Sequence, residues 1–336
     1  MSLKRIIRIL KRTLKEIILD LRNKDFRKII HFLFFIPKQI ILKYPKNISL
    51  EPINACNLKC EFCSSPPKLL KRNLQVLKLE EFKAIINNIK DITHYLWLFL
   101  AGDPFLNPNF PQMIACATKN NLHVTTSTNA LLINKEKAGQ IVKAGLDCLI
   151  VSFDGATKKS YETMRRGGDF EKLLKNINFI LEEKRRQHKV KPEILLQFLV
   201  SKINQHEKRS FIKIANGLGV NYCFKTFGVP TWIYDKNFCE KLANKYLPDE
   251  SSRYDKNKKI KRSKNCVNNE RSFILSNGDI AICCYDLNAQ FKIGNAIKEN
   301  FKDIWQNKKY KKIRQAMTKR QLKICQTCGE TDNLYE

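Results

Sequence analysis

The sequence predicts an α/β fold: a partial, TIM-like (β/α)6 barrel, preceded by a basic amphipathic helix and followed by a small cysteine-bearing domain made of a β-hairpin and a helix. Between residues 47 and 230, short apolar runs alternate with amphipathic segments of helical period. Such alternation is typical of a parallel sheet with right-handed helical crossovers. The chain has 336 residues, 43% of them hydrophobic, which is enough for one large domain with a small companion.

Six strands and five helices are expected in the barrel. The uncharged run at 96–100 is typical of a strand buried on both faces. The predicted strands are 48–53, 94–100, 122–128, 147–153, 193–200 and 220–227. The predicted helices between them are 79–91, 108–120, 134–144, 170–187 and 206–217. We therefore divide the chain into a helical arm (1–46), the barrel (47–230), a basic linker (231–264) and a C-terminal cysteine domain (265–336).

The arm combines an apolar helical face with strong positive charge. Residues 1–50 contain 13 Lys or Arg and three acidic residues. The longest uncharged run, 29–37, is too short to span a bilayer, and charge interrupts the arm too often for a signal peptide. Two alternatives follow: the arm lies in the interface of an anionic membrane, or it docks on the barrel with its basic face in water. The apolar face consists of Leu3, Ile6, Ile7, Leu10, Leu14, Ile17, Ile18 and Leu21.

The most informative motif is a group of three cysteines directly after the first predicted strand: Cys56, Cys60 and Cys63. Three thiolates this close can each bind one iron of a cubane cluster and leave the fourth iron open for a non-protein ligand. Structural zinc, the alternative, requires four ligands, and the nearest further candidate is His94 in an apolar run. Because the cysteines group as metal ligands do and no secretory signal precedes them, we expect a cytoplasmic protein.

Polar and glycine-containing turns follow the next three predicted strands. Because the carboxyl ends of parallel strands meet at one rim of a barrel, we expect these turns and the cysteine loop to form one site. The turns are Ala101-Gly102-Asp103-Pro104, Ser127-Thr128-Asn129 and Ser152-Phe153-Asp154-Gly155.

The cysteine motif resembles the signature of radical S-adenosylmethionine (SAM) enzymes, C-x3-C-x2-C with an aromatic residue before the last cysteine. That signature is matched in full by Cys56, Cys60, Phe62 and Cys63. The resemblance implies a [4Fe–4S] cluster on the three cysteines, with the amine and carboxylate of SAM on the open iron. The reduced cluster then cleaves SAM, and the 5′-deoxyadenosyl radical so formed abstracts hydrogen from a C–H bond.

The resemblance covers roughly residues 47–230 and also implies contacts to SAM. Phe62 is expected on the adenine side, while Gly102 and Asp103 lie in the counterpart of the family's G-G-E-P segment, which receives the amino group. In that segment alanine and aspartate replace the family's glycine and glutamate. The remaining implied residues are Asn129, in a T-N-A version of the usual T-N-G, and Ser152 and Arg165, at positions that touch the ribose and the SAM carboxylate.

A second cysteine group lies near the end of the chain. Apolar segments on both sides of Asn277-Gly278 predict a β-hairpin that brings Cys266 and Cys283 together. This part resembles the C-x9–15-G-x4-C opening of the SPASM extension of radical SAM enzymes, without the later cysteines of its full form, as in the shortened Twitch form. The resemblance implies one auxiliary [4Fe–4S] cluster, for which a four-thiolate zinc site is the alternative. The expected ligands are Cys266, Cys283, Cys325 and Cys328, with Cys284 as an alternative to Cys283.

The leading functional hypothesis is oxidation or rearrangement of a sugar, aminocyclitol or lipid-linked glycan intermediate. A peptide- or protein-modifying maturase is the enzymatic alternative. An iron–sulfur sensor or a nucleic-acid-binding protein that uses the net charge of +30 is the non-enzymatic one. No specific nucleic acid is expected, because the sequence lacks a glycine-rich phosphate loop and zinc-finger spacing. The expected partners are a small-molecule or lipid-linked substrate, an acidic flavodoxin or ferredoxin as reductant, and the inner face of a membrane, contacted peripherally through residues 1–45.

Overall fold

The computed structural model describes residues 14–63, 69–231, 233–250, 253–255, 260–261, 266, 268–326 and 328. Part of the predicted arm (1–13), the basic stretches at 256–259 and 262–265, and residues 329–336 lie outside the described residues.

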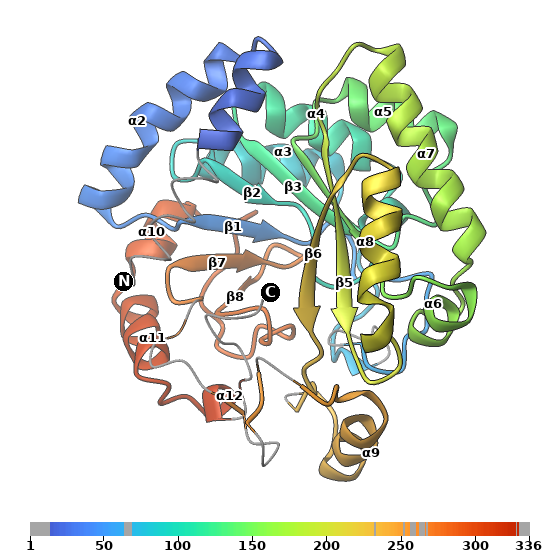
Figure 1. Ribbon diagram of the computed structural model, residues 1–336. Coiled ribbons are helices and arrows are strands. Elements are labelled where there is room, and N and C mark those ends of the chain that lie inside the picture. The colour runs from blue at the N-terminus through green and yellow to red at the C-terminus, as the bar shows by residue number, and fades with distance from the viewer. Residues whose placement is uncertain are drawn as a thin grey trace.

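Eight strands form one sheet in the order β6-β5-β4-β3-β2-β1-β7-β8 (Figure 1). Strands β1 to β6 pair in parallel with their neighbours, which confirms the predicted α/β class and parallel sheet. Among the described residues no pairing between β6 and β8 closes the sheet. The six strands are β1 (Asn47–Leu50), β2 (Tyr95–Trp97), β3 (His123–Thr128), β4 (Cys148–Ser152), β5 (Glu193–Val200) and β6 (Asn221–Thr226).

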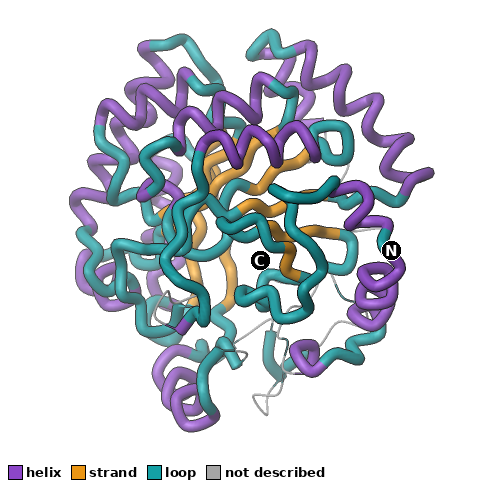
Figure 2. Tube along the Cα trace, turned by 180° about the vertical axis from the view of Figure 1, so that it is seen from behind, coloured by secondary structure: helices purple, strands orange, loops and turns teal. Residues whose placement is uncertain are grey.

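The two faces of the sheet differ in burial. Leu96 and Leu98 are fully buried on the outer face, whereas Trp97 and Phe99 are half-buried on the inner face. The expectation that 96–100 is buried on both faces is therefore wrong, because helices cover only the outer face (Figures 1 and 2). The covering helices are α3 (Leu79–Ile89), α4 (Phe110–Lys119), α5 (Lys135–Lys143), α6 (Lys158–Met164), α7 (Phe170–Arg186) and α8 (Lys208–Gly217), of which α6 was too short and polar to predict.

The C-terminal domain extends the barrel sheet instead of standing apart from it. β7 (Arg271–Ile274) pairs in parallel with β1, and β8 (Ile280–Ala281) returns antiparallel to β7. The turn of this hairpin lies where the sequence predicts it, and Gly278 has a φ of +84°, which favours glycine. Helices α10 (Phe301–Gln306), α11 (Lys308–Thr318) and α12 (Lys323–Gln326) follow.

The segment predicted as a basic linker contains a helix, α9 (Lys236–Tyr246). Cys239, Leu242 and Tyr246 are buried along one side of it. A linker description therefore does not fit this helix, because spacing of three and four residues places these side chains on one face. Neighbouring lysines obscure the stripe in the sequence.

The arm docks on the amino ends of the barrel strands as two helices. Residues 14–22 are helical, Lys24 adopts a φ of +59°, and α2 (Phe26–Leu42) follows. Lys28 is 2% exposed and Phe35 3% exposed, so one face of α2 packs on the barrel, as the docked alternative requires. Within the described ranges, no helix has both the length and the apolar character needed to cross a membrane.

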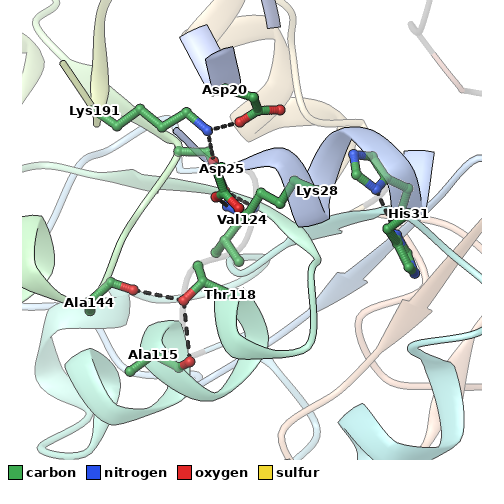
Figure 3. Close-up of polar contacts among 11 residues, drawn as sticks. Asp20, Asp25, Lys28, His31, Ala115, Thr118, Val124, Ala144 and Lys191 are labelled. Atoms are coloured by element: carbon green, nitrogen blue, oxygen red, sulfur yellow. Dashed lines mark hydrogen bonds and ion pairs between the residues drawn. The ribbon is translucent and has the colours of Figure 1, made fainter. Parts of the chain in front are cut away.

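A buried cluster of charges joins the arm to the barrel (Figure 3). Lys28 Nζ lies 2.7 and 2.6 Å from the two carboxylate oxygens of Asp147. Lys191 Nζ lies 2.5 Å from Asp147 Oδ1 and also binds Asp20 of the arm. Burial acts to raise the pKa of Asp147, but the positive charges around it, above all Lys28, outweigh burial and hold that pKa below its usual value.

We predict that Asp147→Asn lowers the free energy of unfolding by about 3–5 kcal/mol, because two buried ammonium groups lose the carboxylate that they share. Chemical denaturation at neutral pH measures this loss. Since the folded-state pKa of Asp147 lies below the unfolded-state value of about 3.9, its contribution is present above that pH and disappears as the pH falls through the folded-state value.

The matched control for this substitution is Lys15→Ala, which removes an exposed ion pair with Glu193. It should change the free energy of unfolding by about 1 kcal/mol or less. An Asp147→Asn effect no larger than that of Lys15→Ala would contradict a stabilising role for the buried cluster.

Candidate functional site

The cysteine loop follows β1 and is contacted by residues of the loops that follow β2 and β3. Cys56, Cys60 and Cys63 are half-buried free thiols. Asn129 Nδ2 donates to Asn57 Oδ1 at 2.9 Å and approaches Cys56 Sγ at 3.9 Å. The three thiols are thus presented at the rim by a loop whose conformation is fixed from the side.

The surroundings of Cys56 favour the protonated thiol. Burial, followed by the nearby Asp103, Cys63 and Cys60, raises its pKa to about 11. A metal ligand must be a thiolate, so binding of a cluster here is expected to release a proton.

Gly102 is required by the close approach of two loops. Its φ is +73°, and a Cβ atom at this position would lie 2.3 Å from the carbonyl oxygen of Ala55 and 2.7 Å from that of Ile53. The next residue, Asp103, donates its backbone N–H to the same Ala55 oxygen at 2.7 Å. The loop after β2 therefore packs directly on the backbone that leads into Cys56.

Asp103 is buried, and its carboxylate accepts bonds from within the rim. The donors are Phe105 N at 3.1 Å, Thr128 Oγ1 at 2.8 Å and Asn129 N at 2.9 Å. Burial raises the pKa of Asp103, although these hydrogen bonds act to lower it. The carboxylate thereby links the loop after β2 to the loop after β3, while its contact with the amino group of SAM stays a prediction.

Arg165, which ends α6, reaches the cysteine loop from a distant part of the chain. Its Nη2 lies 2.5 Å from Asp154 Oδ2, and its Nη1 approaches Cys60 Sγ at 3.9 Å. Its Nε is buried and has no hydrogen-bond acceptor among the described residues. Ser152, at the end of β4, is 8% exposed and lies two residues before Asp154. A buried guanidinium nitrogen that lacks an acceptor among the described residues and lies close to Cys60 is suited to receive a carboxylate, while its contact with SAM stays a prediction.

Asp154 is a residue whose role sequence reasoning missed. It is fully buried, accepts the backbone N–H of Leu199 at 2.8 Å and holds Arg165 in place. The signal was present as an acid in the turn after the fourth strand, but nothing in the sequence pairs it with an arginine eleven residues on.

The back of the cysteine loop is covered by α9, which the sequence did not assign to the site. Phe62 is 7% exposed and packs edge-to-face on Tyr246 and Phe227, with ring centroids 5.1 and 5.7 Å apart. Tyr246 Oη also donates to Glu61 Oε2 at 2.9 Å, and Tyr234 Oη donates to the Cys63 carbonyl at 3.1 Å. The ring of Phe62 is therefore fixed, and its contact with adenine stays a prediction.

The second cysteine group lines one pocket in the C-terminal domain. Cys283 lines it, whereas Cys284 is not among the lining residues and accepts a hydrogen bond from Asn268 Nδ2 at 3.5 Å. Burial raises the pKa of Cys283 and of Cys325. The cysteines of the pocket are Cys266, Cys283, Cys325 and Cys328.

A zinc site, the alternative to an iron–sulfur cluster, would require four ligands around one metal ion. Among the described residues, no group of three or more His, Cys, Asp or Glu side chains closes on a single metal ion. His94, the candidate fourth ligand for the first motif, directly precedes β2 at the amino end of the sheet, where its Nδ1 lies 3.0 Å from His31 Nδ1. It therefore cannot join cysteines that follow the carboxyl end of β1.

Two family models match the chain. The radical SAM superfamily matches residues 50–196, and the iron–sulfur cluster-binding SPASM domain matches residues 266–329. Fe-coproporphyrin III synthase of Methanosarcina barkeri is 30% identical over 128 residues, which are 38% of this chain and 32% of the relative. GTP 3′,8-cyclase of Desulforamulus reducens is 27% identical over 192 residues, which are 55% of this chain and 57% of the relative. The alignments thus span about a third to just over half of these curated relatives.

Solved structures resemble this one in fold. SuiB of Streptococcus suis, bound to the precursor peptide SuiA, superposes with a TM-score of 0.63 at 16% identity, covering 88% of this chain and 72% of that one. BtrN in complex with AdoMet and 2-DOIA superposes with a TM-score of 0.54 at 15% identity, covering 86% of this chain and 96% of that one. The chain thus contains a radical SAM domain at residues 50–196 and a C-terminal iron–sulfur cluster-binding domain of the SPASM type at residues 266–329.

Proposed function

We propose that this chain is a radical SAM enzyme that abstracts hydrogen from a C–H bond of a substrate held inside the barrel. The observation that carries the proposal is the meeting of Arg165, with its buried Nε lacking an acceptor among the described residues, and the loop of Cys56, Cys60 and Cys63. When bound, the [4Fe–4S] cluster and SAM supply one-electron cleavage of a carbon–sulfur bond and hydrogen abstraction from carbon.

The side chains around the cysteines divide the work of binding and orientation. Arg165, held by Asp154, is proposed to bind the SAM carboxylate through its planar fork. Asn129 fixes the loop at Cys56, and Ser152 is proposed to contact the ribose. Phe62, packed against α9, is proposed to lie on the adenine side and to exclude water there.

The four cysteines of the C-terminal pocket are proposed to hold one auxiliary [4Fe–4S] cluster. The donor set of four thiols, three of them buried, suits such a cluster. Because the hairpin of β7 and β8 is part of the barrel sheet, this second centre is fixed relative to the first.

For the substrate, we propose a sugar, aminocyclitol or lipid-linked glycan intermediate that is oxidised or rearranged. Trp97 and Phe99 stack with ring centroids 5.8 Å apart, and the Arg271 guanidinium lies 5.0 Å from the Trp97 ring. Strand register places Gln197 on the same face as Ser152 and Lys225 on the same face as Leu199. An aromatic surface with a few polar groups suits a hydroxylated ring.

A peptide substrate is the second candidate. The observation that favours it is the fold likeness to SuiB, whose structure holds a precursor peptide. Anaerobic incubation with nucleotide sugars in one series and short peptides in another separates the two candidates by which substrate is consumed.

Two partners are part of the proposal. An acidic flavodoxin or ferredoxin is the proposed reductant, because its charge complements the net charge of +30. A peripheral position on a membrane, through the arm, is the proposed location.

The central prediction concerns SAM cleavage. Anaerobically reconstituted, dithionite-reduced protein should convert SAM to 5′-deoxyadenosine, and Cys60→Ala should reduce the yield to that of a protein-free control, because one cluster ligand is lost. Chromatographic quantification of 5′-deoxyadenosine measures this. Equal yields from Cys60→Ala and wild type would refute the proposal, as would failure of the iron-loaded wild type to cleave SAM.

A further prediction tests the role of Arg165. Arg165→Lys keeps a positive charge beside Asp154 but loses the bidentate fork, so SAM should bind about tenfold to a hundredfold more weakly while the iron content is unchanged. Anaerobic equilibrium binding measures the affinity. Arg166→Lys, at the exposed neighbouring residue, is the control and should bind SAM like the wild type. Equal affinities of the two variants would rule out the proposed contact.

The assignment of Cys283 is tested by iron analysis of two neighbouring serine variants. The wild type should contain about eight irons per chain, Cys283→Ser about four, and Cys284→Ser about eight, because of these two neighbours only Cys283 lines the cysteine pocket. About four irons in the wild type would reject the auxiliary cluster. The reverse order of the two variants would assign the ligand to Cys284.

A further inference from the structure

We infer that the solvent-facing side of the arm binds an anionic lipid bilayer and holds the barrel with its catalytic rim pointing away from the membrane. We call this surface the outer arm face. It consists of Leu14, Ile18, Leu21, Phe26, Ile30, Leu33, Phe34 and Ile41, together with the basic residues between them.

Exposed apolar side chains are concentrated on this face. Of the fifteen large hydrophobic side chains that are exposed in the described residues, ten lie between positions 14 and 42. Ile41 is 75% exposed and Phe34 70% exposed. Scattered exposed hydrophobics are normal in proteins, but a contiguous patch marks a surface that another body covers.

The barrel does not account for this patch, because α2 docks through its opposite side. Lys28, His31 and Phe35 contact the barrel or its ion cluster. Phe34 and Ile41 lie seven residues apart on the side that faces solvent, so they form a second stripe along the helix. The two alternatives for the arm, docking and membrane contact, therefore use different faces and are compatible.

Charge on the arm is sorted by side. Its acidic residues are satisfied by the protein: Glu16 accepts from Tyr95 Oη at 2.8 Å, Asp20 binds Lys191, and Asp25 lies 3.6 Å from Lys28. Among the residues between 14 and 46 whose side chains the structure describes, the exposed charged ones are all basic: Arg22, Lys24, Arg27 and Lys43, together with Lys15 and Lys46, which pair with Glu193 and Glu270.

An apolar stripe on an arm whose described exposed charges are all basic suits one partner chemistry, a surface of anionic lipid. A second copy of this chain would bring like charges together around the same stripe, which opposes association.

The position of the arm fixes the orientation of the bound protein. Its contacts with the barrel include Tyr95, at the start of β2, and Asp147 and Lys191, just before β4 and β5. The cysteine loop instead follows the carboxyl end of β1 and is covered by α9, which Figure 1 places at the opposite end of the molecule from α2. The catalytic rim would therefore open toward the aqueous side.

Flotation of full-length, cluster-loaded protein with vesicles tests this inference. Vesicles of phosphatidylcholine and phosphatidylglycerol in equal parts should carry the protein, pure phosphatidylcholine should bind at least about tenfold less, and added salt should weaken binding. The double substitution Phe34→Ser with Ile41→Ser should lower binding to the anionic vesicles by about tenfold or more, because two exposed apolar anchors are lost.

Leu74→Ser is the matched control, since Leu74 is 69% exposed but lies outside the arm. It should bind anionic vesicles like the wild type, and both variants should keep the wild-type melting temperature, because the replaced side chains are in solvent. Equal vesicle binding by the double variant and the wild type would overturn the inference. So would a stable dimer in light scattering that the double variant dissolves, because a second copy would then cover the face.

Hydrogen exchange tests the orientation independently. Anionic vesicles should slow exchange of backbone amides in residues 26–42 and leave those of residues 69–77, which follow the cysteine loop, unchanged. Protection of 69–77 without protection of 26–42 would place the membrane at the wrong end of the barrel. Neither result depends on SAM cleavage, so failure of this inference and failure of the proposed function can be told apart.

Discussion

The buried carboxylate of Asp103 is the interaction on which the arrangement of the site depends. A carboxylate without water is costly unless it is hydrogen-bonded, and here Phe105, Thr128 and Asn129 supply the donors. The same residue donates its N–H to the backbone of Ala55, just before Cys56. Three rim loops thus become one unit, and moving any of them would leave a buried charge unsatisfied.

Glu51 couples this unit to the C-terminal domain. Its side chain is fully buried and accepts two bonds from Arg72, at 2.9 and 3.0 Å, and one from Ser276 Oγ, at 2.8 Å. Ser276 lies in the turn between β7 and β8, whereas Glu51 follows β1. The strand that leads into Cys56 is therefore bonded both to its neighbours in the barrel and to the hairpin that precedes Cys283. This gives a structural reason why the two cysteine groups can share one rigid frame.

Sequence reasoning was strongest where the signal is local. The alternation of strands and helices, the cysteine groups and the Asn277-Gly278 turn each depend on a few consecutive residues, and the parallel sheet followed from them. Contacts between distant residues had no such signal: Lys28 and Asp147 are 119 residues apart, and Arg165 and Cys60 are 105 apart. The position of Arg165 was expected only through the family resemblance. The helix α9 was missed because its buried stripe is interrupted by lysines, so its composition is that of a linker.

Composition alone could not decide what the positive charge is for. A net charge of +30 attracts many anionic partners, and an excess of lysine can reflect composition without function. The structure changes this argument through the acidic residues. Asp20 pairs with Lys191, and Glu16 accepts a hydrogen bond from Tyr95. These acids of the arm therefore face the barrel, and basic and apolar side chains remain on the solvent side. Random enrichment in lysine would add charge to every exposed face, but it would not turn the acids inward and the isoleucines and phenylalanines outward on the same arm. That joint sorting is what distinguishes the outer arm face from the rest of a basic surface.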